Sequence, residues 1–171
     1  MFDKDYAFHG THAEKVIQLT AKIGDTGKSL FDRNLDVYLI APVVGRLYGR
    51  TAERNTKGGK TTNILLGALS SETSKLEMNY RTIMLLDEEG TKNLQDRLDK
   101  VFKITNEDRD KRDIDRYESF VLGGVDILHE KLIEPAKTPS DYFRLLDDFL
   151  NDFNTRYDDK LTDTEEAFIL S

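Results

Sequence analysis

Three arginines in the first half of the chain are spaced so that one helix would carry them on a single face. Arg46, Arg50 and Arg54 lie four residues apart, and helix positions i, i+4 and i+8 form one stripe. Guanidinium groups grip phosphates and carboxylates through paired hydrogen bonds, and Lys57 and Lys60 extend the positive charge. The five side chains are predicted to bind an anionic surface, either nucleic-acid backbone or an acidic protein patch. A solvated helix face is the alternative.

Charge is divided unevenly along the chain, whose net charge is −7. Residues 1–86 hold 12 Lys/Arg and 9 Asp/Glu, whereas residues 87–171 hold 13 and 23. The acidic excess near the C-terminus is explained either by solubility or by docking against a basic partner, a second copy of this chain included. Phe168, Ile169 and Leu170 follow these acids and are predicted to anchor such a partner.

A pair of histidines is the only group that suggests a metal site. His9 and His12 lie near Asp3 and Asp5, and imidazoles with carboxylates can bind a metal ion. Gly10 separates the two histidines, however, so a common face is not assured. We therefore interpret them as surface residues and predict no metal ligand.

Motifs for catalysis are weak. The run Gly59-Lys60-Thr61-Thr62 matches the end of a phosphate-binding loop, but Arg54 occupies the position where that loop needs a glycine. No serine lies in a Gly-x-Ser-x-Gly motif, and cysteine is absent, so no serine or thiolate nucleophile is indicated. The sequence therefore predicts no catalytic residue and no cofactor, although it does not exclude an enzyme.

The chain of 171 residues has the length of one domain. No apolar run approaches the ~18 residues of a membrane span, and the N-terminus lacks the layout of a secretion signal. With no cysteine to form disulfides, a cytoplasmic protein without a membrane partner is expected.

Helical periodicity dominates the chain. Apolar residues recur every three or four positions from about residue 11 to 23, 35 to 50, 74 to 87, 91 to 104, 114 to 133 and 140 to 157. A polar, exposed loop is expected over 51–63, followed by a short apolar element over 63–69. We expect an all-α fold with one domain over 1–171, built as an irregular bundle of six or seven helices, with an acidic, freely moving tail from about residue 158.

Local signals refine this expectation. Thr11 and Glu14 predict a capping box at the first helix. Pro42 predicts a kinked helix, or a break into two helices near Ala41. The glycine pair at 123–124 weakens its helix by ~1 kcal/mol per glycine, unless close packing requires it.

Twelve apolar residues on these helical stripes are predicted to face the core. They are Val16, Ile40, Val44, Leu47, Tyr80, Ile83, Leu98, Val101, Val121, Leu128, Leu146 and Phe149.

Three functions fit these features. The first is a non-catalytic interaction or adaptor module of a cytoplasmic assembly, which binds a protein partner or itself. The second is a nucleic-acid-binding accessory protein, of the kind that works beside a bacterial genome-defence or mobile-element system. The third is a metal-dependent or phosphate-handling enzyme. Binding that falls steeply with salt concentration would separate the second function from the first.

Overall fold

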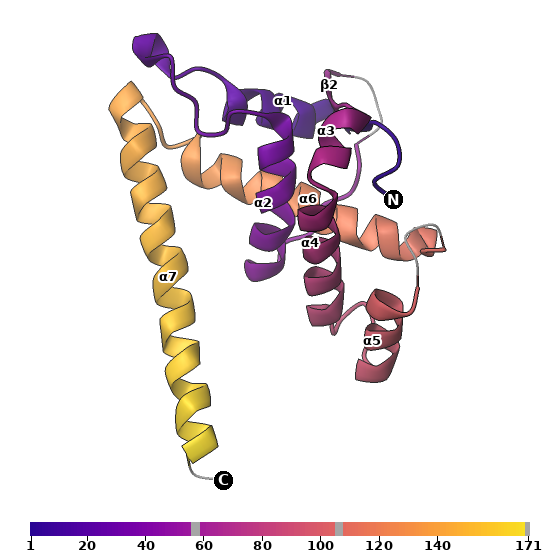
Figure 1. The fold of residues 1–171 in the computed structure, drawn as a ribbon. Coiled ribbons are helices and arrows are strands. Elements are labelled where there is room, and N and C mark those ends of the chain that lie inside the picture. The colour runs from indigo at the N-terminus through magenta and orange to yellow at the C-terminus, as the bar shows by residue number, and fades with distance from the viewer. Residues whose placement is uncertain (56–58, 105–107, 170–171) are drawn as a thin grey trace.

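The computed structural model of the protein describes residues 1–55, 59–104 and 108–169, with side chains described up to residue 155. Seven α-helices lie within these ranges, together with one pair of short strands (Figure 1). The predicted all-α fold is therefore confirmed. The elements in chain order are β1 (Tyr6–His9), α1 (Gly10–Thr20), the 3₁₀ turn η1 (Gly24–Thr26), α2 (Asn34–Leu47), β2 (Thr61–Ile64), α3 (Leu66–Ser71), α4 (Thr73–Leu86), α5 (Leu94–Phe102), α6 (Lys111–Leu132) and α7 (Pro139–Ile169).

The crossing of α2 and α6 forms the centre of the fold (Figure 1). Gly45 of α2 faces the Phe120 carbonyl group of α6, and Gly124 of α6 faces the Ala41 carbonyl group of α2. A methyl group at either glycine would overlap backbone atoms of the other helix. The glycine pair of α6 therefore allows close packing between backbones. This is the condition under which glycine was expected to be tolerated within that helix.

α2 continues as one helix through Pro42, so the break into two helices does not occur. Proline removes a backbone donor and disturbs the turn before it. Here Pro42 is buried, and Asn79 Nδ2 of α4 donates to the Leu39 carbonyl oxygen at 2.6 Å. A side chain of the neighbouring helix thus supports the backbone one turn before the proline, and the sequence of α2 alone does not reveal this contact.

The two short strands were not predicted from the sequence. β1 pairs with β2 in antiparallel register, with Tyr6 opposite Ile64 and His9 opposite Thr61. The loop predicted over 51–63 is therefore wrong for its last residues, which belong to β2.

The pairing of the strands also fixes the start of α1. The capping box predicted at Thr11 does not form, because α1 begins at Gly10 directly after β1 and has no side-chain cap. Gly10 has a φ of +58°, which turns the chain from strand to helix, and its N–H donates to the Lys60 carbonyl oxygen at 2.9 Å. A backbone acceptor beside β2 thus takes the place of the predicted side-chain cap.

Eight of the twelve predicted core residues are buried, namely Val16, Val44, Tyr80, Ile83, Val101, Val121, Leu128 and Phe149. Leu47, Leu98 and Leu146 are half-buried. The prediction is wrong for Ile40, which is 42% exposed. α2 is apolar on most of its surface, so periodicity alone does not indicate which of its sides meets the core.

α7 contacts the rest of the molecule through its first half. The Phe149 ring stacks on the Tyr48 ring with 6.2 Å between centroids, and the Tyr48 hydroxyl donates to Asp152 Oδ2 at 2.8 Å. The second half of the helix extends past the end of α2 (Figure 1), so the acidic segment after residue 158 continues a helix up to Ile169. No helix within the described ranges is both long enough and apolar enough to cross a bilayer.

Candidate functional site

The predicted arginine stripe does not form, because α2 ends at Leu47. Gly49 has a φ of +61°, and its N–H donates to the Arg46 carbonyl oxygen while the Arg50 N–H donates to that of Gly45. These two bonds form a Schellman motif, in which a left-handed glycine stops a helix. The glycine was the signal in the sequence that could have predicted this end.

The three arginines have separate partners within the chain. Arg46 donates to a backbone carbonyl group at the end of α4 at 2.5 Å. Arg50 pairs with Glu130 at 2.8 Å, and Arg54 pairs with Glu118 at 2.6 Å. The side chains of Arg50 and Arg54 remain 47% and 43% exposed, so part of each side chain stays accessible. Their charge is nevertheless compensated by acids of α6.

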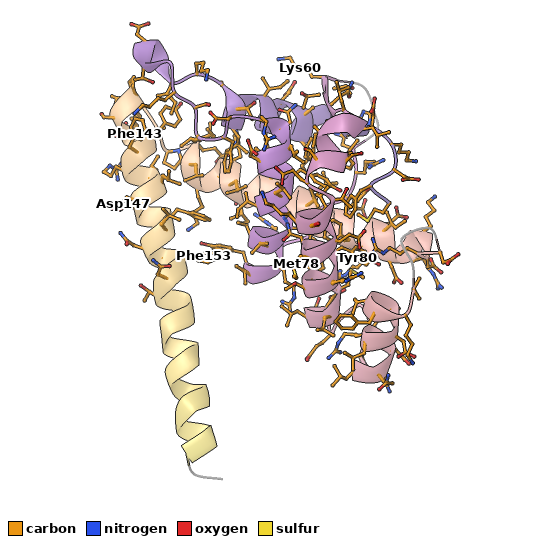
Figure 2. The ribbon with its side chains drawn as sticks, viewed as in Figure 1. Lys60, Met78, Tyr80, Phe143, Asp147 and Phe153 are labelled. Atoms are coloured by element: carbon orange, nitrogen blue, oxygen red, sulfur yellow. The ribbon has the colours of Figure 1, made fainter. Side chains whose placement is uncertain are left out.

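The two lysines of the predicted anion site are placed differently. Lys57 lies outside the described residues. Lys60 is exposed at the edge of the molecule just before β2 (Figure 2). The run from Gly59 to Thr62 leads into a strand, whereas a phosphate-binding loop leads into a helix.

The predicted anchor at the C-terminus falls at the end of α7. Phe168 and Ile169 belong to its last turn, and their side chains are not among those described. Leu170 lies outside the described residues. Docking of this segment remains a prediction.

His9 ends β1, with its Nδ1 3.4 Å from Thr61 Oγ1, whereas His12 is buried in α1. His12 is in the core, with its Nε2 3.3 Å from Asp126 Oδ1, so the interpretation as a surface residue is wrong for His12. Lys15 Nζ lies 2.8 Å from the same carboxylate oxygen. Burial opposes ionisation of Asp126, but the contacts with His12 and Lys15 outweigh it and hold the pKa of the carboxyl below its ordinary value. Within the described part of the chain, no three His, Asp or Glu residues come together as a metal site.

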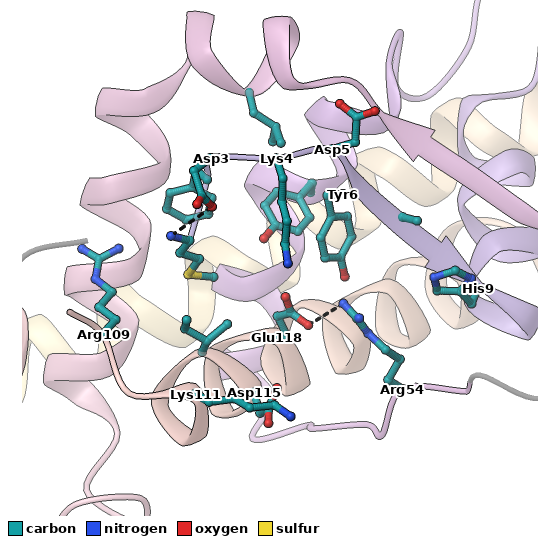
Figure 3. Close-up of a pocket in the computed structure, with 16 residues that line it drawn as sticks. Asp3, Lys4, Asp5, Tyr6, His9, Arg54, Arg109, Lys111, Asp115 and Glu118 are labelled. Carbon is teal, nitrogen blue, oxygen red and sulfur yellow. Dashed lines mark hydrogen bonds and ion pairs between the residues drawn. The ribbon is translucent and has the colours of Figure 1, made fainter. Parts of the chain in front are cut away.

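A cavity of about 680 Å³ opens between the segment around β1 and the first turns of α6 (Figure 3). We call it the N-terminal pocket. Its volume lies in the range of roughly 300–1,000 Å³ found for small-molecule sites. Tyr6 and Tyr38 contribute aromatic lining, and charged side chains surround them, among them Lys4, Asp5, Arg54, Lys111, Asp115 and Glu118.

Burial dominates the electrostatics of this pocket. It raises the pKa of the Glu118 carboxyl, although the nearby Arg54 acts in the opposite direction. It also raises the pKa of the Tyr6 hydroxyl, which is therefore neutral at pH 7. The Tyr6 hydroxyl makes no hydrogen bond of good geometry with any described residue. The pocket thus combines a buried hydroxyl beside Arg54 with a charged rim.

A second depression lies between α2 and α4, and its lining is mainly apolar. Ile40 and Met78 are 42% and 66% exposed, and Phe31, Leu39 and Val43 complete the apolar lining. We call it the α2–α4 groove. Ile40, which was wrongly predicted to face the core, therefore belongs to an open apolar surface.

α7 carries an exposed apolar face of its own. Phe143 and Leu150 are 46% and 50% exposed and lie seven residues apart, with the exposed Asp147 between them on the same face. Figure 2 shows Phe143 and Asp147 on the side of α7 away from α2, and Phe153 on the side toward it. We call Phe143, Asp147 and Leu150 the α7 ridge.

Comparison of the chain with protein-family models, with curated proteins and with solved structures finds no significant match in any of the three.

Proposed function

We propose that the protein is a non-catalytic helical interaction module of a cytoplasmic assembly, and that it associates with a second copy of itself. The observation that carries the proposal is the presence, on one chain, of an open apolar groove and of an exposed apolar helix face. Exposed apolar patches of this kind are typical of interaction surfaces. In the proposed complex, the α7 ridge of one copy lies in the α2–α4 groove of the other.

The shapes of the two surfaces support this pairing. A groove between two helices commonly accepts a third helix, which contributes apolar side chains at positions such as i and i+7. Phe143 and Leu150 have this spacing, which corresponds to roughly 10 Å along the helix axis. Ile40 on α2 and Met78 on α4 expose apolar atoms on the two sides of the groove.

The charges also favour a second copy as the occupant. Asp147 lies between the two apolar residues of the ridge, and its only described hydrogen bond comes from Asn151 at 3.3 Å. Lys75 lies one turn before Met78 in the lining of the groove, and its side chain is 69% exposed although it pairs with Glu72 at 2.8 Å. A ridge with an acid between apolar residues therefore complements a groove with a cation beside apolar residues, and Lys75 would share its charge between Glu72 of its own chain and Asp147 of the other copy.

Substituting either surface should weaken self-association. We expect Ile40→Ser and Phe143→Ser each to raise the dimer dissociation constant by about tenfold or more, because central apolar contacts dominate interface energy. Both side chains are already exposed, so folding should be little affected. Sedimentation velocity over a range of protein concentrations measures the effect, and thermal melting confirms the fold.

Two controls sharpen this experiment. Phe102 of α5 is 62% exposed but lies outside both surfaces, so Phe102→Ser should leave association unchanged. Lys75→Glu and Asp147→Lys should each weaken association, and a chain that carries both should recover it. A wild-type protein that stays monomeric at its highest soluble concentration would contradict the proposal.

The predicted anchor at the chain end is tested separately. If Phe168, Ile169 and Leu170 hold a partner, cutting the chain after Tyr157 should reduce association while the α7 ridge is still present. Unchanged association of the truncated chain would remove these three residues from the interface.

Nucleic-acid binding is the alternative outcome of the same measurements. It has less support, because Arg50 and Arg54 already pair with acids of the chain. If duplex DNA nonetheless binds, affinity should fall steeply with salt. Replacing Arg46, Arg50 and Arg54 by glutamine should then flatten the salt slope by about three units, near one for each lost phosphate contact.

A further inference from the structure

We propose that the N-terminal pocket binds a small organic anion that has an apolar body and a hydrogen-bond acceptor. In this assignment Lys4 and Lys111 bind the anionic group, the tyrosine-lined interior holds the apolar body, and the Tyr6 hydroxyl donates to the acceptor. None of these residues belongs to the α2–α4 groove or to the α7 ridge. The proposal is therefore independent of self-association.

Lys4 and Lys111 are the two lysines at the rim of the pocket, and the charge of Lys4 acts on the nearby Glu118 carboxyl. Lys4 and Lys111 are exposed, and neither forms an ion pair within the described residues. Four carboxylates line the same pocket, namely Asp3, Asp5, Asp115 and Glu118, and two of them pair with other cations, so they compensate the lysines only in part. Asp3 contacts the N-terminal ammonium group at 3.4 Å, Asp5 accepts from the Leu66 N–H at 2.7 Å, and Glu118 pairs with Arg54.

The Tyr6 hydroxyl is one of several buried polar groups without a hydrogen bond of good geometry, and Arg54 is its polar neighbour. Tyr6 is 9% exposed, and its hydroxyl oxygen is buried without a hydrogen bond of good geometry. A buried donor without an acceptor destabilises the folded chain, and a bound acceptor removes that penalty. Figure 3 shows the side chains of Lys4 and Tyr6 directed into the same space, beside the Arg54–Glu118 pair. One small molecule could therefore reach the ammonium group and the hydroxyl together.

A suitable probe is 6-hydroxy-2-naphthoate, which has a carboxylate, an apolar ring system and a hydroxyl oxygen. Titration followed by the fluorescence of the probe should show saturable binding to the wild type. The pair Lys4→Gln and Lys111→Gln should weaken it by about tenfold or more, because charge-assisted hydrogen bonds are the strong ones. The matched pair Lys22→Gln and Lys92→Gln, which removes equal charge from exposed sites outside the pocket, should leave binding unchanged.

The variant Tyr6→Phe tests the hydroxyl with two measurements. It should weaken binding of 6-hydroxy-2-naphthoate by about fivefold but leave binding of 2-naphthoate, which lacks the hydroxyl, at the wild-type level. The melting temperature of the free protein should stay the same or rise, because the variant removes an unsatisfied buried group.

Three results would overturn the proposal. The first is that the wild type shows no saturable binding of the probe. The second is that the variant with Lys4→Gln and Lys111→Gln binds the probe with wild-type affinity. The third is that the melting temperature falls in Tyr6→Phe. The last result would show that the hydroxyl supports the fold.

Discussion

Replacing Gly124 with alanine is expected to lower the free energy of unfolding by about 3 kcal/mol or more. The added methyl group would overlap the carbonyl oxygen of Ala41 across the α2–α6 crossing. Overpacking usually costs ~1–3 kcal/mol, and here no side chain can rotate away, because backbone atoms meet backbone atoms. For a domain of this size such a loss lowers the melting temperature by roughly 6–12 °C.

Gly67 provides the matched control. It lies in α3, and a methyl group there would meet no atom within 4 Å. Gly67→Ala should therefore be neutral or should stabilise the protein by about 0.5–1 kcal/mol, since alanine favours helix. If Gly124→Ala melted like the wild type, the two helices could not approach as closely as described.

Removing the guanidinium group of Arg116 is expected to have a comparable effect. Asp87 is 3% exposed, and Arg116 Nε and Nη2 each donate to one of its carboxylate oxygens at 2.7 Å. Arg116→Met would leave this carboxylate buried without its main partner, which typically costs ~3–5 kcal/mol. Chemical denaturation of the wild type and the variant measures the loss.

Two further variants serve as controls for this measurement. Lys103 pairs with Asp99 at 2.8 Å, and its side chain is 69% exposed, so Lys103→Met should cost less than about 1 kcal/mol. In a chain that carries both Asp87→Ala and Arg116→Met, the loss should be smaller than the sum of the two single losses. Additive losses would mean that the two groups do not interact.

The same pair predicts a pH dependence of stability. Burial opposes ionisation of Asp87, but hydrogen bonds from Arg116 outweigh it and hold its pKa below the ordinary value of 3.8. The unfolded state therefore binds the proton more tightly than the folded state does. The contribution of Asp87 is complete above pH 3.8 and is lost as the pH falls through the lower, folded-state pKa. Asp87→Asn should lack this part of the acid dependence.

The features that could be predicted from the sequence are those that depend on residues close together along the chain. The helical periodicity located the main helices, because apolar residues spaced three or four apart are buried together when a helix packs. Partners from distant segments escaped prediction. The acids that pair with Arg50 and Arg54 lie 80 and 64 residues away, in α6, and the strand that pairs with β1 follows α2.

The candidate sites were harder to predict for the same reason. Lys4 and Lys111 line one pocket only because the segment around β1 lies beside the start of α6. Ile40 belongs to a groove only because α4 packs against one side of α2. The sequence records the type of each side chain, but the side of the helix that stays open depends on tertiary packing.

The α2–α6 crossing also constrains how the chain folds. Gly45 and Gly124 lie 79 positions apart, so their contact closes a long loop before it contributes stability. Contacts at such separation slow folding. During synthesis, the first helices would leave the ribosome without the surface against which they pack. We therefore expect the core to assemble late, after the middle of α6 has emerged, and a fragment that ends before α6 to remain unfolded.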